Sequence, residues 1–238
     1  MKNNFTKFII FLILSLTITF QSSSDEIINL NVTEIEITDD GNILKGYDGG
    51  EAFTNDGVSI TAENFEYNKF LTHLVAYNNV EYKDKKKNII INSNKISYKK
   101  NKEEVEAIGK VLIQDIKRNL NISADKIFYF KKNNQIIGKG NVKIDDYNNN
   151  VIIYADEINY FNEDEKIIAD GNVNFFDHTK EISINANKIT YLKKLEKMYS
   201  EGKTEANLAS KYNFKSSDVT FIKKKKWNYF HQVRLKSE

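Results

Sequence analysis

The residues that could do chemistry are few and far apart in this sequence. His73, His178 and His231 lie in separate parts of the chain, with none of the spacings typical of a metal site. There is no cysteine, which excludes thiolate chemistry, Cys-based zinc sites and disulfide bonds. The serines lie in no Gly-x-Ser-x-Gly elbow. We therefore expect a protein that is not an enzyme, with no catalytic residue, no metal site and no cofactor.

Three acids occur at equivalent places along the chain and could form a carboxylate ladder. They are Glu63, Asp125 and Asp156. Aspartate and asparagine at strand irregularities commonly hydrogen-bond neighbouring backbone groups. We favour this structural role over a catalytic one.

These acids belong to a repeat of 31 residues. Each copy carries an Ala-Asp-x-Ile-x-Tyr motif or a close variant, followed in the central copies by a Gly-Asn-Val step. The motif occurs at Ala62–Tyr67, Ser93–Tyr98, Ala124–Tyr129, Ala155–Tyr160 and Ala186–Tyr191, with fainter copies at Val32–Ile37 and Ser216–Phe221. A fixed period of this kind is the signature of a repeat architecture.

Apolar residues alternate within each copy, as they do in a strand with one buried face. One run, from Ile136 to Ile144, keeps its parity and includes the small residues Gly138 and Gly140. The other run slips by one between Ala124 and Ile127, and the slip recurs in later copies. A built-in bulge or corner would restore the register. We therefore predict two long strands per repeat, one of them bent.

Polar stretches rich in Asn, Asp and Lys separate the strands and have the length of hairpin turns. No helical period occurs between Asp25 and Phe221. The sequence therefore predicts an all-β fold. We expect an elongated β-jellyroll or open β-sandwich of tandem two-strand repeats of about 31 residues.

The ends of the chain differ from the repeats. Residues 1–24 have the features of a signal peptide, with Lys2 and Lys7 followed by the apolar run Phe8–Phe20; an uncleaved anchor is the alternative. We assign residues 25–222 to the repeat domain. The remainder, 223–238, is a basic tail or a truncated end.

Charge argues against one class of partner. The signal-like segment holds two lysines and no acid, so 33 basic and 33 acidic residues remain after it. A nucleic-acid-binding protein would carry a basic excess. We expect no nucleic-acid partner.

Lysines recur at the first turn of each repeat, along one predicted rim. They are Lys99, Lys100, Lys102, Lys131, Lys132, Lys193 and Lys194. Such a row usually marks solvated turns. The functional alternative is a rim that contacts phosphate groups while the trough behind it holds acyl chains.

The signal-like start, the tandem two-strand repeats and the recurring motif together resemble the OstA/LptA family of Gram-negative outer-membrane biogenesis, over about Val32–Phe221. This family includes LptA, the periplasmic part of LptC and the N-terminal domain of LptD. The resemblance implies a periplasmic β-jellyroll, free or associated with the outer membrane, that binds the acyl chains of lipopolysaccharide, or lipid A. It also implies that Lpt-type modules join by pairing edge strands. A self-standing LptA-like protein and a fragment of an LptD protein both fit, and the recurring tyrosines favour the LptD-type domain.

By position, the resemblance implies an apolar trough lined by the inward residues of the central repeats. These ligand-binding residues would be Ile122, Ile127, Tyr129, Val142, Ile144, Ile153, Ile158, Tyr160, Val173, Phe175, Ile184, Ile189 and Tyr191. Small inward residues, among them Gly140 and Gly171, would make room for lipid.

Two other classes of protein also fit parts of this pattern. One is a β-solenoid surface protein or polysaccharide-active enzyme, although long antiparallel hairpins suit the alternation better than coils do. The other is a structural secreted β-array without a lipid ligand, whose interior is filled by its own side chains.

Overall fold

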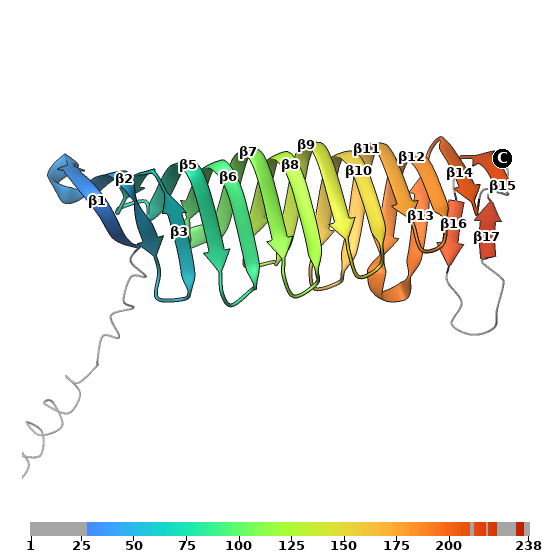
Figure 1. The fold of residues 1–238 in the computed structure, drawn as a ribbon, viewed down its shortest axis with the longest axis horizontal. Helices are drawn as coiled ribbons and strands as arrows, with labels where there is room; N and C mark the ends of the chain where they lie inside the picture. The colour runs from blue at the N-terminus through green and yellow to red at the C-terminus, as the bar shows by residue number, and fades with distance from the viewer. Residues whose placement is uncertain (1–27, 210–211, 218, 223–231, 236–238) are drawn as a thin grey trace, which may run out of the picture.

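The computed structural model describes residues 28–209, 212–217, 219–222 and 232–235. The predicted signal peptide lies outside these residues. The described chain forms one antiparallel sheet of 17 strands, drawn out along a single long axis (Figure 1). The predicted all-β, elongated fold is confirmed.

Most strands of the central part are 11 or 12 residues long, as a two-strand repeat of 31 residues requires. The strands are β1 (Asn29–Thr38), β2 (Ile43–Phe53), β3 (Val58–Ala62), β4 (Asn64–Asn68), β5 (His73–Asp84), β6 (Ile89–Lys99), β7 (Glu104–Asp115), β8 (Leu120–Phe130), β9 (Gln135–Asp146), β10 (Val151–Phe161), β11 (Lys166–Asp177), β12 (Ile182–Leu192), β13 (Lys197–Glu201), β14 (Thr204–Leu208), β15 (Tyr212–Ser216), β16 (Val219–Ile222) and β17 (Gln232–Leu235). Short 3-10 turns occupy Asp39–Gly41, Lys100–Lys102 and Lys193–Leu195.

The strands follow one another as a meander. From β5 to β12 each strand pairs antiparallel with the strands before and after it in sequence. β3 and β4 are two halves of one broken strand, because both pair with β2 and with β5. β13 and β14 divide in the same way against β12. The hairpins exclude the coil-by-coil β-solenoid that the sequence left open.

Both strands of each repeat bend near the middle, not one of them as we expected. The slip in β10 falls where predicted, at Ala155–Glu157. Its partner β9 bends as well, because Gly140 and Asn141 both have left-handed backbone angles, with φ of +75° and +48°. The same pairs of positive φ recur one repeat away, at Gly109 with Lys110 and at Gly171 with Asn172. A two-residue irregularity leaves the alternation in phase, so parity alone could not reveal it.

We call these bends the corners, and a polar contact supports each one. The Asp125 carboxylate lies directly over Gly140 and accepts a hydrogen bond from Asn141 Nδ2 at 2.8 Å. Asp156 contacts Gly171 and accepts the same bond from the following asparagine at 2.8 Å. The recurring acids are therefore structural, as expected, but their partner is a side-chain amide rather than the backbone. Gly140 and Gly171 lie at the corners, so the expectation that they line the interior is wrong.

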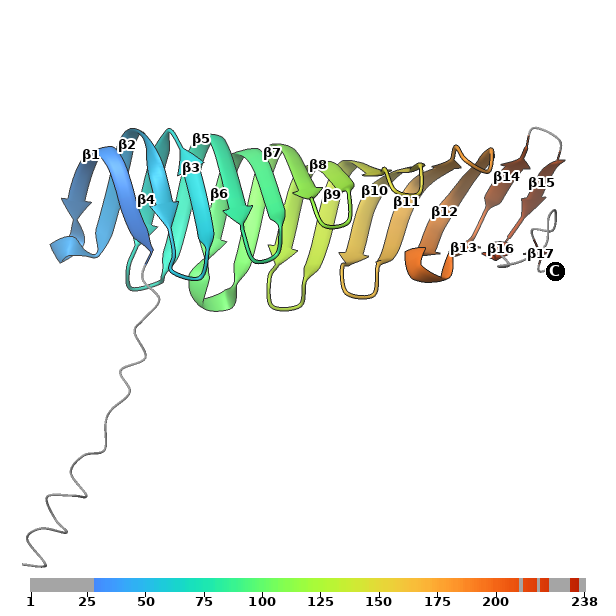
Figure 2. The same cartoon turned by 60° about the horizontal axis from the view of Figure 1, so that its bottom comes forward.

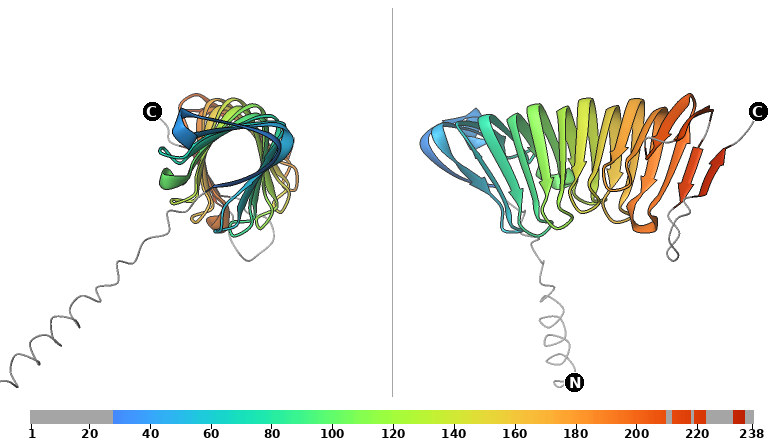
Figure 3. Two further views of the ribbon diagram at one scale, coloured as in Figure 1. Left: turned by 90° about the vertical axis from the view of Figure 1, so that its left-hand side faces the viewer. Right: turned by 45° about the vertical axis from the view of Figure 1, so that its right-hand side comes forward.

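The corners let one sheet bury its own apolar face. Seen along the axis, the strands form a ring (Figure 3). Buried residues alternate with partly exposed ones on either side of the corner, as in β9 with its buried Ile136, Gly138, Val142 and Ile144. The sheet therefore needs no second layer to cover it.

Hydrogen bonds between successive turns explain the constant period. Lys131 N donates to Glu103 O at 2.9 Å, and Asn162 N donates to Asn134 O at 3.1 Å. On the other rim, Tyr147 N donates to Asn119 O at 3.2 Å. Because each turn bonds to the same turn of the preceding repeat, an insertion in one copy would break the stack.

The sheet continues beyond Ile222, where we expected the repeats to end. β16 pairs with β13, and β17 pairs with β16. A buried polar contact anchors this part, since Val219 N donates to Ser200 Oγ at 3.1 Å. Part of the predicted tail is thus a strand, and the rest lies outside the described residues.

The corner generates a first prediction. Replacing Gly140 by Ala forces a Cβ into the Asp125 carboxylate and puts an L-residue in a left-handed conformation. We expect a loss of about 2–4 kcal/mol in the free energy of unfolding, measured by urea denaturation.

A double-mutant cycle separates the two causes. In an Asp125→Ala background the same Gly140→Ala change should cost only the backbone strain, about 1 kcal/mol. Gly41→Ala is the matched control, since Gly41 also has positive φ but a Cβ added there would meet no atom within 4 Å. An equal cost in both backgrounds would contradict the packing role of Asp125.

Candidate functional site

The residues expected to line a trough all lie inside the rolled sheet. Each is at most 5% exposed, and together they belong to one hydrophobic cluster that runs along the axis. The protein's own side chains fill the space around them, since Ile144 and Tyr160 have 0% exposure. The structure thus brings the predicted set together on one inner surface.

Tyrosines are the largest side chains that are fully buried in this interior. Tyr82 makes edge-to-face contacts with Tyr98 and Tyr129, at ring-centroid distances of 5.9 and 6.4 Å. Further along, Phe175 and Tyr191 pack in the same way at 5.5 Å. Such geometry is favourable for aromatic rings.

Several of these tyrosines bury a hydroxyl group that forms no hydrogen bond within the described part of the chain. This applies to Tyr82, Tyr129 and Tyr160. Burial, with the nearby charges of Asp84 and Asp115, raises the pKa of Tyr129 well above its ordinary value, so the phenol stays protonated. An unmade hydrogen bond of a buried hydroxyl costs about 1–3 kcal/mol. The interior therefore presents unused donors among its apolar side chains.

Two rows of turns run along one side of the molecule (Figure 2), and ion pairs and hydrogen bonds connect them. We call this line of contact the seam. Lys131 forms ion pairs with Asp84 and Asp56, at N–O distances of 3.3 and 3.2 Å. Lys193 pairs with Asp146 at 3.0 Å. The seam therefore joins a turn to a strand end 47 residues earlier, and the contact between Asn162 and Asp115 spans the same separation.

The aspartates at the strand ends of the seam use their two carboxylate oxygens for different contacts. One oxygen caps its own turn, as when Asp84 Oδ1 accepts from Lys87 N at 3.0 Å and Asp115 Oδ1 accepts from Arg118 N at 3.1 Å. The other oxygen faces the opposite rim and its cation or amide. These carboxylates are almost fully buried, so they need a charged or hydrogen-bonding partner.

One contact of the seam has an asparagine in place of the lysine. Asn162 stands where neighbouring repeats have Lys131 and Lys193, and its Nδ2 donates to Asp115 Oδ2 at 3.3 Å. The missing positive charge comes from Arg118, whose guanidinium lies 3.1 Å from the same oxygen. The charge on Asp115 is thus balanced from its own turn.

The first lysine of each turn is therefore neither solvated nor available to phosphate. Lys100, Lys131 and Lys193 are 4–6% exposed and ion-paired. Lys132 and Lys194 remain exposed. One sequence signal could have indicated the seam, namely an aspartate that recurs every 31 residues at Asp84, Asp115, Asp146 and Asp177. The sequence does not show which lysine lies opposite each aspartate.

The Asp56 end of the seam is tightly held. Burial opposes ionisation of this carboxyl, but hydrogen bonds from Thr54 and Lys100 and the charge of Lys131 outweigh it, so the pKa of Asp56 lies far below its ordinary value. Because the folded-state pKa is lowered, its stabilising contribution is present above the unfolded pKa of about 4 and is lost only as the pH falls into strong acid.

The sheet has open edges at its two ends. Among the described strands, β1 pairs with β2 alone, and it exposes Ile35 and Ile37 at 48% and 61%. At the other end β17 pairs with β16 alone among the described strands. An edge strand of this kind has unpaired backbone groups that can bind another strand.

The candidate chemical residues are not brought together. His73 hydrogen-bonds Ser97 Oγ at 2.7 Å, and His178 stacks on Phe176. His231 lies outside the described residues. Among the described residues, no group of three His, Cys, Asp or Glu could hold a metal ion. In the same part of the chain, no helix has the length and hydrophobicity needed to cross a membrane.

Several solved structures resemble this chain, and LptH is one of them. LptH from Pseudomonas aeruginosa, described as the LptA-homologous periplasmic component of the lipopolysaccharide transport device, aligns with a TM-score of 0.44 and 16% identity. The alignment covers 49% of this chain and 83% of LptH. No protein-family model and no curated protein matches the sequence. At this identity and TM-score the likeness carries no argument about function.

The seam generates a second prediction. Lys131→Asn removes the cation that faces the buried Asp84, and we expect a loss of about 3–5 kcal/mol in the free energy of unfolding by urea denaturation. Adding Lys87→Arg, which copies the arrangement of Arg118, should recover at least half of that loss. The exposed neighbour gives the control: Lys132→Asn should change stability by less than about 0.5 kcal/mol. Full stability of Lys131→Asn would contradict the role of the seam.

Proposed function

We propose that this chain is a non-enzymatic lipopolysaccharide-binding transport module of the periplasm. In this proposal the rolled sheet holds acyl chains along its axis, and its edge strands join partner modules. The supporting feature is one apolar column that runs through all the central repeats and is bridged on one side by the polar contacts of the seam. A column of this kind is long in one direction only, as an acyl chain is.

The observation that carries the proposal is the set of unused tyrosine hydroxyls. The phenols of Tyr82, Tyr129 and Tyr160 have no hydrogen-bond partner in the core. A core made only of side chains would gain stability from phenylalanine at these positions. Acyl chains bound through ester or amide links bring carbonyl oxygens that can accept these bonds. The hydroxyls therefore favour a ligand with both apolar and carbonyl groups.

The sheet edges support the second part of the proposal. β1 is an edge of ten residues without proline, and its outer side chains include exposed Ile35 and Ile37. Strand addition to such an edge would continue the sheet, and with it the apolar column, into the next module. A second copy or another Lpt-type β-jellyroll has the matching edge.

A packed structural array is the second candidate function. The feature that favours it is the nearly complete burial of the inner residues by one another. Under this alternative the interior never opens, and the protein binds no lipid. The two candidates differ in one measurable property, the uptake of lipid A.

A third prediction concerns this property. Ile144→Asp and Ile153→Asp each place a charge on the inner surface and should abolish binding of lipid A, measured by mass spectrometry of the native complex after incubation. Lys143→Ala, on the outward side of β9 next to Ile144, should retain binding within about twofold because it removes no inner surface.

A further variant separates loss of binding from loss of folding. Ile144→Ala costs about 2–4 kcal/mol through the cavity it leaves, yet it keeps the inner surface apolar. We expect it to bind lipid A at about 10 °C, where the folded sheet retains most of its stability and circular dichroism can verify it. Absence of lipid from the wild type and from every variant would leave the packed array as the function.

A fourth prediction concerns the edges. A photo-crosslinking amino acid at Ile37, on the exposed edge strand, should capture a second copy of this chain or another β-jellyroll module. The same group at Leu195, an equally exposed turn residue far from the edge, serves as the control. Crosslinks that form at Leu195 and not at Ile37 would rule out joining through β1.

A further inference from the structure

The outer face of the sheet carries a polar groove near its C-terminal end that the seam and the interior do not use. Two cavities of about 360 and 480 Å³ lie side by side there and share Asn185 and Glu205 in their linings. The first is also lined by Asn172, Asn174, Asn187 and Lys203, and the second by Ser183, Asn207, Asn213 and Lys215. Carboxamides therefore dominate this surface.

Strand register arranges these side chains in two parallel rows across five strands. The first row is Tyr154, Asn174, Asn185, Glu205 and Lys215, each paired with the next. The second row is Ile152, Phe176, Ser183, Asn207 and Asn213. Paired residues of neighbouring strands share a face, so both rows point outward together. Five strands at about 4.8 Å spacing give a surface about 19 Å wide.

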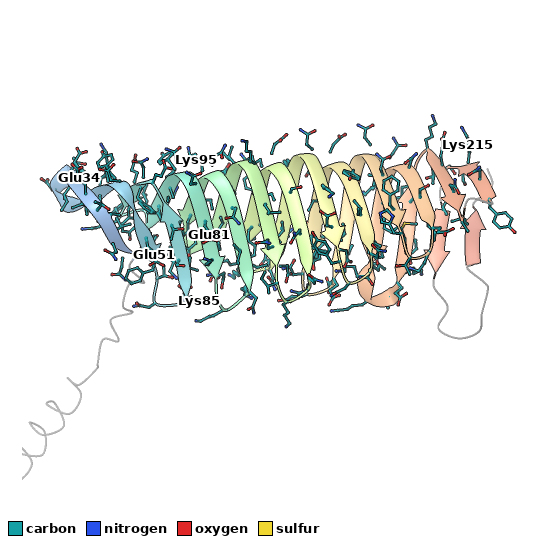
Figure 4. All side chains as sticks on the ribbon, viewed as in Figure 1. Glu34, Glu51, Glu81, Lys85, Lys95 and Lys215 are labelled. Atoms are coloured by element: carbon teal, nitrogen blue, oxygen red, sulfur yellow. The ribbon has the colours of Figure 1, made fainter. Side chains whose placement is uncertain are left out.

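The two ends of the rows differ in chemistry. At one end Tyr154 and Phe176 make an edge-to-face pair at 6.3 Å, with Tyr154 42% exposed. At the other end Lys215 forms an ion pair with Glu205 at 2.8 Å, and Figure 4 shows Lys215 projecting away from the ribbon. Amides and one serine hydroxyl lie between them.

Several of these polar groups are already oriented. Asn172 Nδ2 donates to Asp156 at 2.8 Å, and Asn174 Nδ2 donates to the backbone oxygen of Asn172 at 3.0 Å. Asn207, which lines the larger cavity, has a buried carboxamide oxygen that finds no hydrogen-bond partner among the described residues. A ligand hydroxyl that reached this oxygen would satisfy it, so the site has an unmet demand for a donor.

We propose that this groove binds a hydroxyl-rich oligosaccharide. Carboxamides both donate and accept hydrogen bonds, as sugar hydroxyls do. An aromatic ring at the end of such a row offers an apolar face to a sugar ring. The charged groups are few, Lys203 and Lys215 with Glu205, so the hydrogen bonds of the carboxamides dominate recognition. The inference does not rest on lipid carriage, because the groove lies on the opposite face of the sheet from the core.

The test uses the whole chain and two glycans that carry no acyl chain. One is the core oligosaccharide released from lipopolysaccharide by mild acid, and the other is a soluble peptidoglycan fragment; these represent the two available sources of such a glycan. Isothermal titration should detect binding of at least one of them, with a Kd below about 1 mM. Whichever binds identifies the source.

Matched variants locate the binding. Asn185→Ala and Tyr154→Ala change exposed side chains and should each raise the Kd about fivefold to tenfold. Asn92→Ala, an outward carboxamide on β6 far from the groove, should leave the Kd unchanged within twofold. Binding that is insensitive to Asn185 and Tyr154, or absent for both glycans, overturns the proposal. Lipid A uptake is measured separately, so failure here leaves the proposed transport function standing.

Discussion

A single sheet with one apolar face must cover that face, and the described part of this chain has no α-helix or second sheet to do so. The corners solve the problem within each strand. Left-handed residues such as Gly140 and Asn141 turn the strand in the middle, so that its two halves contribute to one enclosed interior. Burying one isoleucine in that interior is worth about 1.5–3 kcal/mol, and every repeat adds several. Two left-handed residues in every second strand, with a register shift in the strand between, thus make the core possible.

The seam follows from the same bend. Once the strands curl, their two sets of turns approach each other, and the polar groups at the strand ends lose water. Asp84, Asp115 and Asp146 are buried there because the sheet closes, and each is balanced by a cation or an amide. The interior and the seam are therefore two results of one geometry, and the outer face remains free for other contacts.

Much of this arrangement could be predicted from the sequence. Alternation located the strands, the period located the hairpin turns, and inward parity identified residues such as Ile144 and Tyr160 as core. The corner at Gly140 could not be predicted, because a two-residue irregularity leaves the alternation of apolar residues in phase. The seam could not be predicted for another reason. Lys131 and Asp84 come together only because the sheet is rolled, and no local sequence pattern indicates a contact between residues 47 positions apart. The period of the repeat predicts which neighbouring strands pair, but it does not predict the contacts between the two rows of turns.

The offset of the seam also determines how the molecule can change in length. Three contacts of the seam connect residues one and a half repeats apart at the same two positions of the repeat: Lys131 with Asp84, Asn162 with Asp115 and Lys193 with Asp146. The ion pairs of Asp56, at the N-terminal end of the seam, lie outside this pattern. Duplication or loss of one whole 31-residue unit would therefore keep the lysine or asparagine of these contacts opposite its aspartate, whereas an insertion of another length would shift one row of turns relative to the other. Each unit contributes two strands and about 10 Å of sheet. The length of the sheet along its axis therefore changes in fixed steps, and the number of repeats in the chain determines the distance that it spans.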